Sequence, residues 1–170
     1  MAWYRGARRP LDEAEKSTDA AKARARAMEL LAGQELSSGG LYERLNRRFA
    51  GQTAAAVVAE MVEREYVNDA RYAETRAHGL LAAKKSRRAA AQNLRQKGLS
   101  APQIEQALDT VYAADETGED PELEAAAALV ASRYRKKLEV GRRDLVVAAL
   151  MRRGFAYPVI RDAIQRVEQE

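Results

Sequence analysis

A short segment occurs twice along the chain and restricts the folds that the chain can adopt. Residues 94–104 read Leu-Arg-Gln-Lys-Gly-Leu-Ser-Ala-Pro-Gln-Ile, and residues 150–160 read Leu-Met-Arg-Arg-Gly-Phe-Ala-Tyr-Pro-Val-Ile, with Leu, Gly, Pro and Ile in register. The two glycines, Gly98 and Gly154, lie 56 residues apart. Self-similarity at a spacing of this size indicates a repeated supersecondary unit.

Each copy predicts a helix, a tight turn and a second helix. The glycine is expected to adopt the left-handed conformation that ends a helix, and the proline is tolerated only in the first turn of the next helix. Apolar residues then follow at the 3.6-residue spacing of one helix face in both copies. They are Ile104, Ala107, Leu108, Val111 and Tyr112 in the first copy and Ile160, Ala163, Ile164 and Val167 in the second. No segment shows the sustained alternation of a strand, so the predicted fold is all-α.

Start and stop signals along the rest of the chain predict three units of three helices each. The first helix is expected to start near Ser17-Thr18-Asp19, and Ser37-Ser38-Gly39-Gly40 is expected to cap the second. The other expected caps are Thr53, Asn68, Ser86, Ser100 and Asp120. The predicted organisation is a mobile arm over residues 1–18, three-helix repeats over 19–66, 67–114 and 121–170, and an acidic linker over 115–120. Because a unit of this size buries too little surface by itself, the repeats are expected to stack into an elongated, curved array.

The composition excludes several classes of function. The absence of cysteine removes disulfides and thiolate metal sites and suits a reducing compartment. No apolar run is long enough to span a bilayer, and the N-terminus does not read as a signal peptide, so we expect a cytoplasmic protein without a membrane partner. His78 is the only histidine and is expected to be solvated, which leaves no histidine pair for a metal and no nucleophile relay. We predict no catalytic residue, metal or cofactor, and because no heptad seam is present we expect a monomer.

Basic residues are concentrated in two segments of the chain. The net charge is +4 and the isoelectric point is about 9.4, yet residues 84–97 contain no acid and residues 133–153 contain eight basic residues. A gathered positive charge suits a polyanion or an acidic protein partner. If the repeats stack in the same orientation, the basic helices would line one side of the array. The predicted basic face consists of Arg87, Arg88, Arg95, Lys97, Lys136, Lys137, Arg142, Arg143, Arg152 and Arg153.

A helix-turn-helix protein that acts directly on DNA is the alternative interpretation. The segment from residue 87 to residue 114 has the outline of that motif. The recognition helix would then be 101–114, which carries Glu105 and Asp109 and no Lys or Arg. An acidic helix reads a polyanion poorly, so this hypothesis ranks second.

Three segments stand out in order along the chain: residues 66–73, Tyr-Val-Asn-Asp-Ala-Arg-Tyr-Ala; Ser86-Arg87-Arg88 with 94–99; and 152–157 followed by Ile160. Each is similar to a signature segment of one family, and over residues 20–168 the chain resembles the RecX regulatory proteins of bacteria. The family residues expected to be mainly structural are Tyr66, Asn68, Asp69, Arg71, Tyr72, Gly98, Gly154, Phe155 and Tyr157.

The resemblance implies tandem three-helix repeats and a regulatory role without catalysis. It implies binding to the RecA recombinase, along the groove of its filament on single-stranded DNA, with inhibition of ATP hydrolysis, strand exchange and co-protease activity. Contact with single-stranded or double-stranded DNA is a further implication. Two departures from the family pattern stand out. Glu65 occupies the place of a usual glycine, which suggests a different turn, and Arg47-Arg48-Phe49 replaces Arg-Arg-Gly-Phe in the first repeat.

Overall fold

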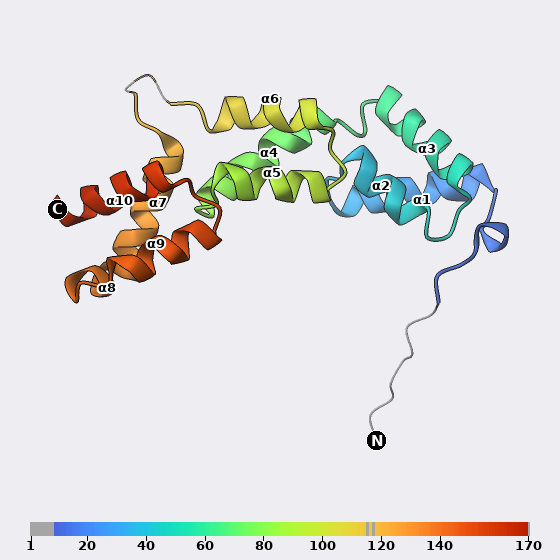
Figure 1. Cartoon of the computed structure of the whole chain (residues 1–170). Coiled ribbons are helices and arrows are strands. Elements are labelled where there is room, and N and C mark those ends of the chain that lie inside the picture. Colours follow the sequence, from blue (N-terminus) through green and yellow to red (C-terminus); the bar gives the residue numbers. More distant parts are fainter. Residues whose placement is uncertain (1–8, 115, 117, 170) are drawn as a thin grey trace. The chain divides into compact units, whose positions relative to one another are not determined.

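The computed structural model describes residues 9–114, 116 and 118–169, and this part of the chain folds into helices without a strand (Figure 1). The all-α prediction is therefore confirmed. The chain divides into two compact units, Met1–Asn68 and Asp69–Glu170. The second and third predicted repeats consequently belong to one unit, whereas the first forms a unit of its own.

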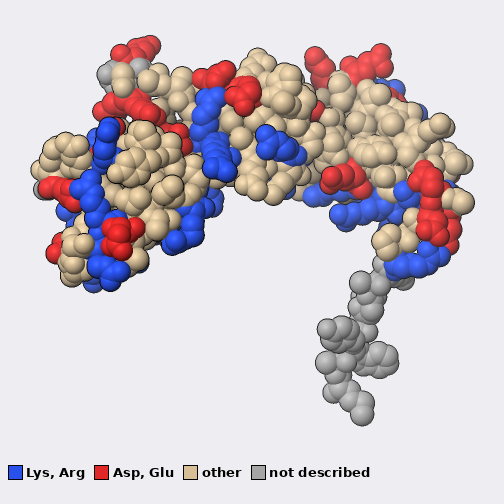
Figure 2. Space-filling model, viewed as in Figure 1, with Lys and Arg blue, Asp and Glu red and all other residues tan. Residues whose placement is uncertain are grey.

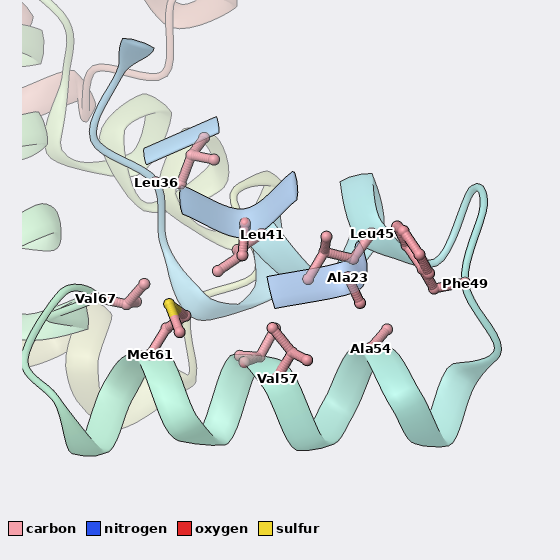
Figure 3. Packing of buried hydrophobic residues seen from close by; sticks show 11 residues of the cluster. Ala23, Leu36, Leu41, Leu45, Phe49, Ala54, Val57, Met61 and Val67 are labelled. Carbon is pink, nitrogen blue, oxygen red and sulfur yellow. The ribbon is translucent and has the colours of Figure 1, made fainter. Parts of the chain in front are cut away.

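Three helices form the first unit: α1 (Ala20–Gly33), α2 (Ser38–Leu45) and α3 (Gly51–Glu63). They pack pairwise around one core, with Ala54, Val57 and Met61 of α3 facing the side chains of α1 and α2 (Figure 3). The buried residues of this core are Ala23, Ala27, Leu36, Leu41, Leu45, Phe49, Ala54, Val57, Val58, Met61 and Val67.

The start of α3 differs from the predicted cap at Thr53. The N-cap is Ala50, which has no side chain that can accept a hydrogen bond, and the helix begins at Gly51. The N–H of Gly51, which has no acceptor within the helix, instead donates to the Glu13 carboxylate Oε1 at 2.5 Å. A distant carboxylate therefore replaces the local cap, because an unpaired N–H at a helix start requires an acceptor.

A mobile arm was predicted over residues 1–18, but residues 13–17 make defined contacts with the rest of the first unit. Residues 1–8 lie outside the described residues. Glu13–Glu15 form a short 3₁₀ helix, η1. The backbone of Ser17 then donates to the Arg48 carbonyl and accepts from the N–H of Ala50, at 2.9 Å in both cases. This segment is therefore fixed to the turn between α2 and α3.

The second unit opens with α4 (Asp69–Ala82), α5 (Arg87–Gln96) and α6 (Ala101–Val111). Two caps are found where they were predicted: the Ser86 hydroxyl accepts from the N–H of Ala89, and Ser100 forms a capping box with Gln103. The buried residues of this part are Ala73, Ala77, Leu80, Ala90, Leu94, Leu99, Ile104, Ala107, Leu108, Val111 and Tyr112.

The remaining helices surround a further core of the same unit. They are α7 (Pro121–Leu129), a π-helical segment η2 (Val130–Tyr134), α8 (Arg135–Glu139), α9 (Arg143–Arg152) and α10 (Tyr157–Gln169). The first three are continuous and form the single long helix that the cap at Asp120 predicted. Their core consists of Ala126, Ala127, Leu129, Val130, Val146, Leu150, Phe155, Ile160, Ala163, Ile164 and Val167. Helix α4 contacts α7, which joins the two cores into one unit.

The repeated glycines have the predicted left-handed conformation, with φ of 79° at Gly98 and 90° at Gly154. The different turn suggested by Glu65 is wrong, because this residue has φ of 60° and so keeps the geometry that favours glycine. Lys84, after α4, adopts the same region at φ 56°.

Candidate partner-binding surface

The N-terminus of α5 meets the C-terminus of α9 within the second unit. The Ser86 hydroxyl donates to the Arg153 carbonyl at 2.9 Å and is fully buried. Gly154 makes this approach possible, because a Cβ atom there would lie only 2.7 Å from the Ser86 Oγ. The contact brings Arg88 close to the end of α9, since the same Cβ position lies 3.6 Å from the Arg88 Cβ. Arg88 of the second repeat and Arg153 of the third therefore start from neighbouring backbone at this junction.

Arg87 points its guanidinium toward α6 and has a local structural role. One guanidinium nitrogen donates to Asp109 at 2.7 Å and to Glu105 at 3.0 Å. The hydrogen bond to Asp109 is the main cause of a raised Arg87 pKa. The backbone N–H of Arg87 donates to Glu122 at 3.0 Å. Arg87 thus connects α5 with α6 and α7, and its charge is already neutralised by two carboxylates.

A buried polar pair at the same junction was missed by the sequence reasoning. The Tyr112 hydroxyl donates to the Lys85 carbonyl at 2.9 Å, and burial raises the pKa of Tyr112 to about 12. Burial also raises the pKa of Glu122. The sequence predicted Tyr112 only as a member of an apolar helix face and made no prediction for Glu122, because neither local pattern indicates these contacts.

Arg142 and Arg143 each have a carboxylate partner, in contrast to the predicted free basic face. Arg142 lies 3.3 Å from Asp144, and this hydrogen bond lowers the pKa of the Asp144 carboxyl. Arg143 lies 3.1 Å from Glu168 of α10. All four side chains are largely exposed, so these ion pairs contribute little stability but reduce the charge offered to a partner.

The other predicted basic residues reach solvent. Arg88, Arg95, Lys97, Lys136, Lys137 and Arg152 are exposed, and Arg153 is half-buried. Lys137 lies over the Tyr134 ring at 5.7 Å. In the second unit, Figure 2 shows Lys and Arg side chains around α8 and α9 and at the start of α5, and acidic side chains along α6 and the segment before α7. The name junction surface is used below for Arg88, Arg152 and Arg153, none of which forms an ion pair with a carboxylate within the part of the chain that the structure describes.

The family signature residues have mixed positions. Asp69 accepts from Gln103 at 3.4 Å, which connects α4 to α6, and Arg71 is exposed. Tyr72 packs against the second-unit core, and Phe155 is buried. The exposed members are Tyr66, Asn68, Gly98 and Tyr157, and Gly154 is half-buried.

The described residues offer no metal centre, since no three His, Asp or Glu side chains among them lie close enough to hold an ion. His78 is exposed and lies 3.9 Å from Glu74. No helix among the described residues combines the length and apolarity that a membrane crossing needs.

Comparison with known proteins gives a consistent result. Residues 68–108 match the family model for the second three-helix domain of RecX. The fold is similar to the crystal structure of RecX from Lactobacillus salivarius, with a TM-score of 0.75 and 20% identity over 89% of this chain and 98% of that chain. It is also similar to a crystal structure of regulatory protein RecX, with a TM-score of 0.72 and 20% identity over 89% of this chain and 72% of that chain. A search of curated protein sequences gave no match.

The fold defines a class of protein, the helical repeat proteins, and within the second unit Arg88 and Arg153 come together where two repeats meet. Within this class, the sequence match covers α5, the helix that carries both Arg88 and Arg95. The RecX family model thus matches residues 68–108, and the similarity of the rest of the chain to the solved RecX structures is one of fold.

Proposed function

We propose that the protein is a cytoplasmic regulator of a RecA-type recombinase, without catalytic activity of its own. It binds the RecA filament on single-stranded DNA and inhibits ATP hydrolysis, strand exchange and co-protease activity. The observation that carries this proposal is the match of residues 68–108 to a RecX domain. The name of a structurally similar protein, regulatory protein RecX, gives further support.

The junction surface is the part of the second unit best suited to this partner. Its three arginines lack local carboxylates among the described residues, so a partner can use their full charge. The Ser86–Arg153 hydrogen bond and the close approach at Gly154 hold them on a rigid backbone, which lowers the entropy lost on binding. Complementary charge mainly raises the association rate and the salt sensitivity of such a complex.

Direct DNA recognition by a helix-turn-helix is the weaker candidate. In this interpretation α6 would be the recognition helix, and its Glu105 and Asp109 both accept hydrogen bonds from Arg87. Helix α6 carries no Lys or Arg that could donate to base edges in the major groove. Tight duplex binding without a recombinase would favour this candidate.

The test is the single-strand-dependent ATPase of RecA. We expect the protein to slow hydrolysis at substoichiometric amounts, and Arg152→Gln with Arg153→Gln to reduce its inhibitory potency by about tenfold, from two lost charge-assisted contacts. The matched control is Arg142→Gln with Arg143→Gln, which removes the same charge from arginines that already have partners and should reduce potency less. Undiminished hydrolysis at equimolar protein would contradict the proposed function.

A further inference from the structure

The first helix of the third repeat changes its winding partway along. Helix α7 continues into α8 (Figure 1), and the residues between them, η2 (Val130–Tyr134), form a π-helical turn. Backbone hydrogen bonds in such a turn join residues five apart instead of four, so the turn holds one residue more than an α-helical turn. Tyr134, where η2 meets α8, has φ of −124° and ψ of −2°, whereas an α-helix has about −63° and −42°. The helix therefore shifts its register by one residue at this point.

This register decides which side chains of the helix face the core. The buried face of α7 and η2 contains Ala126, Leu129 and Val130. Residues three, four and seven positions apart share a face of an α-helix, so an uninterrupted helix would place Arg133 and Lys137 next on this face. Both of these cations are exposed in the structure. The buried face therefore does not continue in the α-helical register.

Tyr134 and Leu138 take the inward places instead. Each lies one position beyond the cation that the α-helical register would turn inward, and each is half-buried against the core of the third repeat. One additional residue in a helix turns everything after it by about 100°. This rotation accounts for the exchange of two cations for two largely apolar side chains. The Lys137 ammonium lies 5.7 Å from the centre of the Tyr134 ring, a contact that favours the same register.

A serine hydroxyl supports the π-helical turn. The Ser132 hydroxyl donates to the Ala128 carbonyl at 2.6 Å and lies 3.5 Å from the Leu129 carbonyl. A side-chain hydroxyl that bonds a carbonyl of the preceding turn competes with the backbone N–H groups and bends a helix. This hydrogen bond therefore makes a departure from the α-helical register less unfavourable.

Few contacts oppose a rotation of α8. No residue of Arg135–Glu139 is buried, and Leu138 is the member of α8 that packs against the core. The turn after α8 is tied to that helix by backbone hydrogen bonds. The N–H of Gly141 donates to the Leu138 carbonyl at 2.9 Å, and the N–H of Arg142 donates to the Lys137 carbonyl at 2.8 Å. The turn can therefore follow α8 when the helix rotates.

The two registers differ by opposing contributions to the free energy. The α-helical register would restore the ordinary hydrogen-bond spacing over η2. It would also lay the carbon stems of Arg133 and Lys137 against the core while their charges reach solvent. In exchange it would withdraw Tyr134 and Leu138, which are half-buried and so contribute less than fully buried side chains. The difference between the registers is therefore smaller than the loss of two fully buried side chains.

We propose that the helix formed by α7, η2 and α8 is a switch between two registers. In the first register, which the structure shows, η2 holds the additional residue, and Tyr134 and Leu138 face the core. In the second register the helix is α-helical throughout, α8 is turned by about 100°, and this apolar pair reaches the surface beside the basic residues of α8. A partner that covers the pair would select the second register. The switch does not rest on the proposed function.

The experiment is NMR relaxation dispersion on the backbone amides of the full chain, which detects exchange on the microsecond to millisecond timescale. We expect exchange at residues 130–139 and none in α3. Arg133→Leu should raise the population of the second register about tenfold, because this leucine becomes buried only there.

Arg135→Leu is the matched control, since it removes the same charge and adds the same side chain. Residue 135 is exposed in the first register and lies opposite Ala126, at about 180°, in the second. The population of the second register should therefore change by less than about twofold.

Deletion of Ser132 tests the additional residue itself. The deletion places Tyr134 and Leu138 in α-helical step with Val130, so that one register satisfies both the backbone and the core. Exchange at residues 130–139 should disappear, and circular dichroism melting verifies that each variant is folded. If the deletion prevents folding, the comparison of Arg133→Leu with Arg135→Leu decides. Absence of exchange in both the unaltered chain and Arg133→Leu, an equal rise in Arg135→Leu, or unchanged exchange after the deletion would each overturn the proposal.

Discussion

At the scale of single residues, Gly154 satisfies two requirements at once. Its φ of 90° lies in the left-handed region, and the Ser86 hydroxyl occupies the space that a side chain would need. Glu65 and Lys84 show that the left-handed conformation alone does not demand glycine in this chain. It is the close approach of Ser86 that distinguishes Gly154 from those two positions.

Gly154→Ala should therefore destabilise the protein by about 2 kcal/mol or more, because backbone strain and a steric clash add together. The measurement is urea unfolding followed by circular dichroism. Gly79→Ala is the matched control, since this helical glycine has no atom within 4 Å of its Cβ position and a negative φ. There we expect a gain of about 0.5–1 kcal/mol from helix propensity. A loss of similar size in both variants would contradict the role given to Gly154.

At the scale of elements, the N-termini of α5 and α7 are tied to one another by backbone and side-chain groups. Glu122 in the first turn of α7 accepts from the N–H of Arg87, and Asp120 caps the same helix. Glu122 is half-buried, and burial raises its pKa. A carboxyl whose pKa is raised on folding binds its proton more tightly in the folded state. Ionisation of Glu122 therefore lowers the free energy of unfolding as the pH rises from the pKa of the unfolded state through the pKa of the folded state.

Glu122→Gln should consequently raise the melting temperature at pH 7, because the amide oxygen still accepts from Arg87 and no charge is buried. This gain in melting temperature should shrink as the pH falls. It should vanish below the ordinary glutamate pKa of 4.5, where Glu122 is protonated in both the folded and the unfolded state. The measurement is calorimetry of both proteins across this range. A difference that grows toward acid pH would show that the carboxylate is stabilised by its surroundings.

Helix boundaries and turns were predictable because their causes are local. Ser86, Ser100 and Asp120 cap helices that begin within three residues of them, and Gly98 ends a helix by its own conformation. The cap of α3 was missed because its acceptor, Glu13, lies 38 residues away in the sequence.

The ion pairs of the predicted basic face were also out of reach of the sequence. Arg87, Arg88 and Arg95 lie on α5, Lys136 and Lys137 on α8, and Arg143 and Arg152 on α9, whereas Lys97, Arg142 and Arg153 cap helix ends. Arg142 pairs with the nearby Asp144, but two other arginines pair with distant carboxylates. Arg87 pairs with Asp109, 22 residues along, and Arg143 with Glu168, 25 residues along. Charge counting along the chain cannot distinguish these arginines from Arg88 or Arg152, because the partners come together only when helices pack.

At the scale of the whole molecule, the chain consists of two compact units although its sequence repeats three times. The second and third repeats share hydrogen bonds from Ser86 to Arg153 and from Arg87 to Glu122. Each unit has its own buried side chains, so stability is distributed over two cooperative blocks.

Thermal or urea unfolding should accordingly show two transitions. Leu45→Ala, in the first-unit core, should lower the free energy of unfolding of the first unit by about 3 kcal/mol. Leu150→Ala should lower that of the second unit by a similar amount. Both leucines are fully buried, so each variant is the control of the other. Movement of both transitions by either substitution would show that the units unfold together.

The Ser86–Arg153 hydrogen bond joins residues 67 positions apart in the sequence. On the ribosome, α4, α5 and α6 are therefore synthesised before the carbonyl that accepts from the Ser86 hydroxyl exists. The first unit, in contrast, has all of its own residues as soon as residue 68 has been added. Synthesis from the N-terminus onward thus lets the first unit complete its core while the second unit still waits for α9.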